Sequence, residues 1–212
     1  MKKIIKLEKW PNRLTLLRMV VPIAFIPCVL TNSIILNYVA LFLFAIGAYT
    51  DYLDGYIARK YKIVSDFGKI MDPVADKLLV FSAFICFVQL GIVQAWMVII
   101  IISRDFFVSG VRVMAAKKGG DIIEASGWGK TKTLTQILSI LIILALIAIQ
   151  NTIEFYASPW EQSLMNGGNA GKAILYLIYY APYWLMFISA ILALVSGFDY
   201  FFRNRKLFDN EV

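Results

Sequence analysis

The sequence predicts an all-helical integral membrane protein with six transmembrane helices, both termini in the cytoplasm and a short amphipathic segment at the amino terminus. Of its 212 residues, 60% are hydrophobic and 17% are charged, and the mean hydropathy is +0.71. An average soluble domain is about 45–50% apolar and about 25% charged. A chain of this size could not bury so much apolar surface. The bilayer is therefore the expected solvent, and long apolar runs without polar alternation predict helices rather than barrel strands.

Six apolar segments approach the length of about 20 residues that crosses the hydrocarbon core. The stretch 1–13 before them is basic, and Ile4, Leu7 and Trp10 among its lysines predict that it lies on the membrane surface. No linker or internal repeat divides the chain, so residues 1–212 are expected to form a single membrane domain. The six segments are Leu14–Thr31, Ser33–Asp54, Pro73–Leu90, Ala95–Ala115, Thr133–Ile149 and Lys172–Phe202.

The distribution of the net charge of +7 sets the expected orientation. With a cytoplasmic amino terminus, every Lys and Arg outside the apolar segments falls on the inner side, and Lys172 alone lies near the outer face. The outer loop 150–171 carries Glu154 and Glu161 as its only charges. This asymmetry follows the positive-inside rule and predicts that both termini are cytoplasmic. The basic residues then report topology, and no nucleic-acid partner is expected.

Four aspartates cluster where the second and third segments meet the cytoplasm. Asp51 and Asp54 are three residues apart, and Asp72 and Asp76 are four apart, so each pair occupies one helix face. Consecutive spans joined by a short loop are antiparallel neighbours, and the two acidic faces can therefore meet. The chain has no histidine, which removes the commonest metal ligand.

Four carboxylates brought together at low dielectric must either hold protons or bind cations. Hard oxygen ligands suit Mg²⁺ or Mn²⁺, and four carboxylates are enough for two ions that together hold a diphosphate. Two alternatives remain open: Asp72 precedes Pro73 and could cap a helix, and Asp51 and Asp54 could pair with Arg59 or Lys60 at the interface. Four ionisable groups at membrane depth favour a functional site.

Small residues accompany the acids. Gly55 and Ala58 lie on or beside the face of Asp51 and Asp54, which leaves room for a ligand to approach the backbone. Arg59 follows two turns after Asp51 and could contact phosphate. The full pattern from Asp51 to Asp76 reads D-x2-D-G-x2-A-R-x8-G-x3-D-x3-D.

This pattern resembles the signature of the CDP-alcohol phosphotransferases at every specified position. The resemblance covers most of the chain, because that family is also six-helical with both ends in the cytoplasm. Three further stretches resemble its bacterial members that make phosphatidylglycerophosphate: P-N-x-L-T-x2-R from residue 11, S-R-D-F from residue 103 and G-K-T-K-T from residue 129.

The resemblance implies a bacterial cell-membrane enzyme with its active site on the cytoplasmic side, usually a homodimer, which uses CDP-diacylglycerol and releases CMP. It implies that Asp51, Asp54, Asp72 and Asp76 bind two divalent ions, Mg²⁺ or Mn²⁺, and that Asp76 is also the catalytic base on the acceptor hydroxyl. The residues it implies for the CDP-lipid site are Asn12, Thr15, Gly55, Ala58, Arg59 and Ser65.

Basic residues elsewhere indicate the acceptor. Arg104 and Arg112 are eight residues apart in the fourth segment, and Lys130 and Lys132 begin the fifth. Together they could form an anion pocket for an acceptor that carries phosphate, such as glycerol 3-phosphate; inositol phosphate would want the same pocket. The alternative is that Arg112 and the lysines reach anionic lipid head groups. Arg104 lies deeper, and Asp105 beside it could belong to a buried polar network. A cation-coupled membrane carrier is the alternative from another class.

Overall fold

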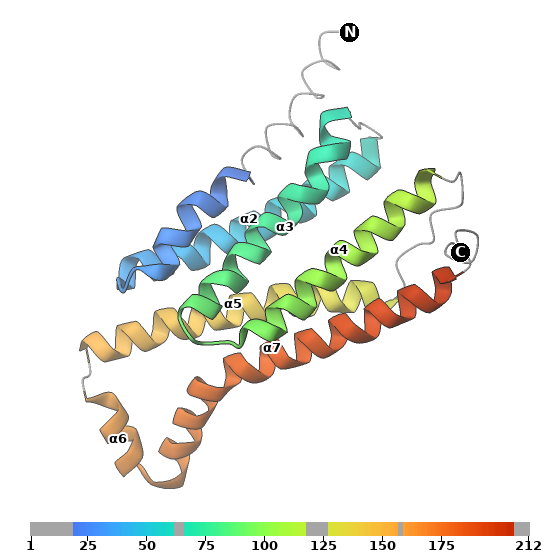
Figure 1. Cartoon of the computed structure of the whole chain (residues 1–212). Coiled ribbons are helices and arrows are strands. Elements are labelled where there is room, and N and C mark those ends of the chain that lie inside the picture. The colour runs from blue at the N-terminus through green and yellow to red at the C-terminus, as the bar shows by residue number, and fades with distance from the viewer. Residues whose placement is uncertain (1–18, 62–65, 118–126, 157–158, 206–212) are drawn as a thin grey trace, which may run out of the picture. The chain divides into compact units, whose positions relative to one another are not determined.

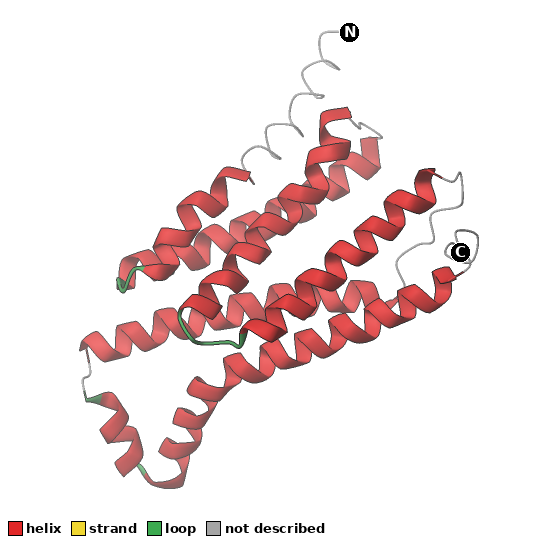
Figure 2. Ribbon diagram, in the orientation of Figure 1, coloured by secondary structure: helices red, strands yellow, loops and turns green. Residues whose placement is uncertain are grey.

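The computed structural model describes residues 19–61, 66–117, 127–156 and 159–205. Inside the helices, the side chains of residues 51–61, 66–74, 76, 115–117, 127, 128 and 130 lie outside the description. All regular secondary structure in the described ranges is helical (Figure 2). The prediction of an all-helical chain is confirmed to that extent. The predicted amphipathic segment 1–13 lies outside the described residues.

Each of the six predicted segments has a helix (Figure 1). The first is described over Met19–Leu30. The others are α2 (Ile34–Tyr61), α3 (Asp66–Gln89), α4 (Ala95–Lys117), α5 (Gly127–Tyr156) and α7 (Gly168–Asn204), and the short α6 (Trp160–Asn166) lies between α5 and α7.

Several helices extend beyond the apolar runs that predicted them. α2 continues to Tyr61 and α3 begins at Asp66, seven residues before Pro73. An apolar run marks only the part of a helix that can sit in hydrocarbon, whereas polar residues such as Lys, Arg and Glu continue the helical backbone readily. The interpretation of Asp72 as an N-cap is therefore wrong, because Asp72 lies inside α3 and not at its start.

The predicted outer loop 150–171 is mostly helical. α5 runs to Tyr156 and is followed by α6, and α7 starts at Gly168, whose φ is +74°. Gly171 approaches the backbone of Leu164 so closely that a Cβ atom there would collide with the Leu164 carbonyl. α6 and the start of α7 therefore fold back on each other, with Gly168 adopting the positive φ and Gly171 permitting the close approach.

Two described helices are long and apolar enough to cross a membrane by length and composition: Thr131–Tyr156 and Gly168–Asn204. Shorter apolar helices cover Met19–Leu30, Ile34–Thr50 and Lys77–Gln89. α7 has 37 residues with Pro182 inside it, and at 1.5 Å per residue it is about 55 Å long. That exceeds the hydrocarbon thickness of about 30 Å, so a spanning α7 must tilt or project.

The chain divides into two compact units, each made of two separated stretches. Unit 1 comprises residues 1–90 and 140–175. In its core Phe25 and Phe44 pack with ring centroids 6.0 Å apart, and Phe84 and Phe87 are fully buried. α2 contacts α3, and this helix pair carries the four aspartates.

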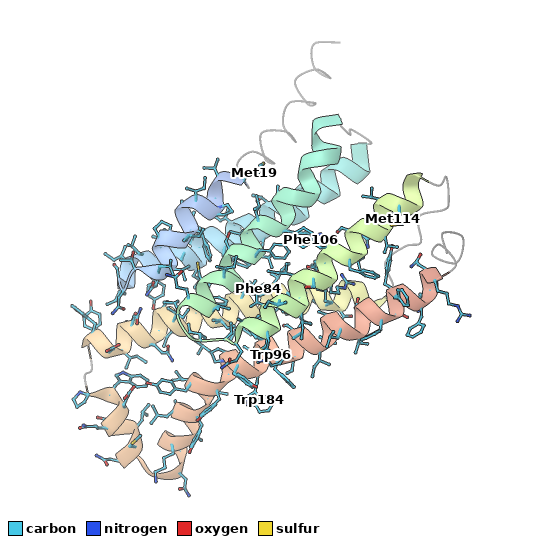
Figure 3. All side chains as sticks on the ribbon, viewed as in Figure 1. Met19, Phe84, Trp96, Phe106, Met114 and Trp184 are labelled. Carbon is cyan, nitrogen blue, oxygen red and sulfur yellow. The ribbon has the colours of Figure 1, made fainter. Side chains whose placement is uncertain are left out.

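Unit 2 comprises residues 91–139 and 176–212. It contains α4, the first part of α5 and most of α7, and Met97, Ile101 and Met186 are fully buried in it. Trp96 and Trp184, both labelled in Figure 3, each contact the ring of Phe187 nearly at right angles, at 80° and 88°. The core of unit 2 also contains a polar cluster, which is described below.

Candidate active site

The acidic positions all lie on the two helices that contact each other in unit 1. Asp51 and Asp54 are in α2, and Asp72 and Asp76 are in α3. Gly55, Ala58 and Arg59 follow in the last turns of α2. The side chains of these seven residues are outside the described part of the chain, so the structure fixes their positions along the helices. Asn12, Thr15 and Ser65 lie outside the described residues altogether.

Gly47 and Leu79 mark the level at which α2 and α3 come together. A Cβ atom added to Gly47 would collide with the side chain of Leu79, so the two helices are in close contact there. Because the helices are antiparallel and rise equally per residue, seven residues along α2 match seven residues back along α3. Position 54 is therefore level with position 72, and position 51 is level with Ala75.

From helical periodicity we expect the acidic positions on the contacting faces. On α3, Ala75 is 1% exposed and Leu79 is 6% exposed, which identifies the buried stripe. Positions 72 and 76 precede Ala75 and Leu79 by three residues each and share that stripe. On α2, positions 51 and 54 follow Gly47 by one and two turns on the same face. The backbone thus brings the four positions to one end of one helix pair.

The donor set at this end fits a hard divalent cation. Four carboxylates offer only oxygen ligands, which Mg²⁺ and Mn²⁺ prefer, and the chain has no histidine to offer instead. Among the described side chains no other group of three or more Asp, Glu, Cys or His residues could hold a metal ion. The four aspartates are therefore the candidate ligands.

A buried charge cluster occupies the core of unit 2. Nζ of Lys132 on α5 donates to Oδ1 of Asp105 on α4, and Nη1 of Arg104 donates to the same oxygen at 3.2 Å. Nη2 of Arg104 donates to Oγ of Ser196 on α7. The side chains of Lys132, Asp105 and Arg104 are 3%, 11% and 14% exposed. Among the described side chains, this largely buried cluster contains two cations and one anion, a composition suited to contact with an anion.

Glycine at position 197 admits Arg104 to this cluster. A Cβ atom on Gly197 would lie 3.0 Å from Cγ of Arg104, so the arginine stem passes directly over the α7 backbone. Such a contact is tighter than ordinary van der Waals packing. A side chain at 197 would therefore require the Arg104 stem to move by a few tenths of an ångström.

Of the four basic residues predicted for the acceptor pocket, the structure joins two. Arg104 and Lys132 meet through Asp105, and the prediction that Asp105 belongs to a buried polar network is confirmed. Arg112 is exposed and makes a different contact, with its guanidinium carbon 5.9 Å from the centroid of the Tyr200 ring. Lys130 begins α5, and its side chain is outside the described part.

Sequence reasoning did not identify Ser196 and Gly197 as members of this cluster. Each is a small residue in an apolar helix, a common occurrence that carries no signal on its own. Their signal is visible only in combination: Ser189, Ser196 and Asn204 recur at seven- and eight-residue spacing on α7 and are all buried. A buried polar stripe at that spacing indicates a helix face that meets polar partners.

Known proteins resemble the chain over most of its length. The family model described as CDP-alcohol phosphatidyltransferase matches residues 9–197. A protein of Bacillus subtilis named CDP-diacylglycerol–glycerol-3-phosphate 3-phosphatidyltransferase is 37% identical over 162 residues, which are 76% of this chain and 71% of that protein. Proteins with the same name from Rickettsia felis and Rickettsia bellii are each 32% identical, over 93% and 95% of this chain and 96% and 98% of their own lengths.

Proposed function

The chain belongs to the CDP-alcohol phosphatidyltransferase family, and from that premise we propose that it transfers the phosphatidyl group of CDP-diacylglycerol to glycerol 3-phosphate. The products are phosphatidylglycerophosphate and CMP. The relatives' names supply both substrates, and the matched range includes all four aspartates. Because the chain belongs to an enzyme family, we set aside the alternative of a cation-coupled carrier.

In this proposal, Asp51, Asp54, Asp72 and Asp76 hold two divalent cations, Mg²⁺ or Mn²⁺. The antiparallel register of α2 and α3 supports this, because it gathers the four positions at one end of the pair. Such ions, when bound, neutralise the charge of a diphosphate and stabilise its leaving oxygen. Four aspartates without cations would repel one another strongly at that depth.

The protein groups then bind and orient the substrates. Asp76 accepts the proton of the acceptor's primary hydroxyl, whose oxygen attacks the β-phosphorus of CDP-diacylglycerol. The bond from that phosphorus to the bridging oxygen breaks, and CMP leaves with the bridging oxygen. The residues proposed for the cytidine diphosphate are Asn12, Thr15, Gly55, Ala58, Arg59 and Ser65, with Gly55 and Ala58 providing room beside the backbone.

The observation that favours a phosphate-bearing acceptor is the buried positive cluster of unit 2. Among the described side chains, Arg104 and Lys132 share the single carboxylate of Asp105, and both cations are largely removed from water. A buried excess of positive charge repels cationic alcohols such as choline or ethanolamine and attracts a phosphate monoester. We assign the acceptor phosphate to this cluster, with Lys130 and Arg112 as further cations of the pocket. Inositol phosphate carries the same group and remains the alternative acceptor.

The membrane topology of the proposal is six spans with both termini in the cytoplasm. The two long apolar helices and the three shorter ones support it. So does the number of large apolar side chains exposed on them: Ile23 is 71% exposed, Phe42 65% and Leu177 67%. Apolar exposure on this scale would be a liability in water, but it is normal against lipid. The localisation that follows is the bacterial cell membrane, with the active site facing the cytoplasm. The proposal also includes the homodimer that the family resemblance implies.

An acceptor panel tests the choice of substrate. The purified protein in neutral detergent receives Mg²⁺, CDP-diacylglycerol and one alcohol at a time: glycerol 3-phosphate, inositol phosphate, glycerol, choline or ethanolamine. The proposal predicts rapid CMP release with glycerol 3-phosphate and the corresponding phosphatidyl product by mass spectrometry. Preference for glycerol over glycerol 3-phosphate would contradict the assignment of the acceptor phosphate to the cluster. Preference for inositol phosphate would agree with phosphate binding by the cluster but would identify a different acceptor.

A further inference from the structure

Gln136 lies on the face of α5 that carries Lys132, one turn further along the helix. Both side chains are buried, each at 3% exposure, and Ser139 continues the same buried polar stripe at 1%. Residues four apart on a helix are neighbours on its surface. Gln136 is therefore the next buried polar side chain on this face of α5 after Lys132, whose ammonium group we assign to the acceptor phosphate.

The polar neighbours of Gln136 have hydrogen-bond partners within the fold, but the amide nitrogen of Gln136 has none among the described residues. Oγ of Ser139 is 3.1 Å from Oγ of Ser189, and Lys132 is paired with Asp105. Among the described residues, Nε2 of Gln136 has no hydrogen-bond partner. A buried amide without a partner costs free energy, which an apolar residue of the same shape would not.

The helices opposite Gln136 present apolar side chains at its level. The Ser139–Ser189 contact sets the antiparallel register of α5 and α7, and this places Gln136 near Ala193, which is fully buried. The Lys132–Asp105 contact sets the register with α4, and this places Gln136 near Ile101, also fully buried. Within the described part of unit 2, the fold itself therefore gives the Gln136 amide nothing to donate to.

A second unsatisfied donor belongs to the same cluster. Nε of Arg104 is buried and has no partner among the described residues, although both of its terminal nitrogens are bonded. These two unsatisfied atoms are both N–H donors, and the described charged side chains of the cluster are two cations and one anion. An anion rich in acceptor oxygens would satisfy these N–H donors and also interact favourably with the neighbouring cations.

We propose that Gln136 is a specificity-determining residue that donates its Nε2–H to a phosphate oxygen of the acceptor alcohol. The inference rests on the proposed function and adds a residue to it. Lys132 and Arg104 supply the charge, and Gln136 supplies a neutral donor whose direction is fixed by its burial. A donor in a fixed place distinguishes a phosphate monoester from an acceptor that lacks the group, because without it the amide stays unpaired.

The test is Gln136→Met, which keeps the length of the side chain and removes the donor. The KM for glycerol 3-phosphate should rise about tenfold or more, the effect of losing one hydrogen bond to a charged group. The KM for CDP-diacylglycerol should not change. The melting temperature in detergent should stay the same or rise, since the variant removes an unpaired buried amide. Ser139→Ala is the matched control one turn away, and it should leave both KM values unchanged.

Each other result is informative. An unchanged KM for glycerol 3-phosphate in Gln136→Met overturns the inference, and so does a fall in melting temperature without a change in that KM, which would mean that the amide is paired within the fold. The assay is repeated with phosphatidylglycerol in the micelles: a variant that alters only the response to this lipid assigns the site to a lipid phosphate and also overturns the inference. Absence of CMP release by the wild-type protein would instead contradict the proposed function.

Discussion

Lys132 on α5 and Asp105 on α4 form an ion pair whose side chains are 3% and 11% exposed. Arg104 shares the same carboxylate oxygen, so one aspartate holds two cations between three helices. An ion pair removed from water contributes little net stability, but breaking it leaves a buried charge without compensation. The cluster is therefore sensitive to loss of Asp105, which is its one anion among the described residues.

Asp105→Ala should lower the free energy of unfolding by about 3–5 kcal/mol, the range for removing one partner of a buried pair. Thermal unfolding in detergent measures the change. Arg203→Ala is the control, because its ion pair with Asp199 is on the surface, with the Arg203 side chain 57% exposed, and such pairs contribute about 0–1 kcal/mol. The double variant Asp105→Ala/Lys132→Met should recover part of the loss. Equal stability of Asp105→Ala and Arg203→Ala would show that the cluster is not buried as described.

Gly47→Leu should weaken both the fold and the activity. The new side chain meets Leu79 where α2 and α3 touch, and overpacking of this kind costs about 1–3 kcal/mol. The larger side chain also pushes α2 and α3 apart near the acidic positions. Small displacements of reacting groups can lower rates by about a hundredfold. Melting temperature and CMP release are the measurements.

Two variants make this result specific. Gly110→Ala is the control, since a Cβ atom there meets nothing within 4 Å and alanine is the better helix former. Leu79→Ala combined with Gly47→Leu should restore part of both losses, because the contacting pair is coupled. Full activity of Gly47→Leu would contradict the close contact between the two helices.

The proposed topology can be tested with a membrane-impermeant maleimide after Cys28 and Cys86 are replaced by alanine. Gln162 on α6 and Arg205 after α7 are both exposed. The outer loop 150–171 carries no basic residue, which predicts that it lies outside the cell, so a cysteine at 162 should react in intact cells. A cysteine at 205, on the predicted cytoplasmic side, should react only after permeabilisation. Labelling at 205 in intact cells would contradict the proposed orientation and indicate the opposite one.

The apolar runs were sufficient to predict where six helices lie but not where they end. α2 and α3 continue through polar residues that no hydropathy argument includes, which is why Asp72 resembled a cap. α6 was missed because its seven residues are mixed in polarity and because its hairpin with α7 depends on the contact between Gly171 and Leu164. Helix ends and short helices are determined by local contacts more than by composition.

The site shows the same division. The spacing of the four aspartates is a local property of two helices and can be read from the sequence, whereas the facing of the two pairs stays a prediction. The unit 2 cluster joins residues 27 and 92 positions apart, and no periodicity predicts which serine will meet Arg104. The unpaired amide of Gln136 could be recognised only once its surroundings were known.

The most direct test of the account is metal-dependent CMP release by the wild-type protein and by Asp54→Ala, with CDP-diacylglycerol and glycerol 3-phosphate. Asp54 is level with Asp72 in the antiparallel pair, and the substitution removes one of the four carboxylates that we propose as ligands. The account predicts CMP release with Mg²⁺ or Mn²⁺, none after chelation, and a fall of at least about a hundredfold in Asp54→Ala. The control Gly110→Ala should keep wild-type activity. CMP release by Asp54→Ala at the wild-type rate, or wild-type activity that survives chelation, would contradict the four-aspartate site.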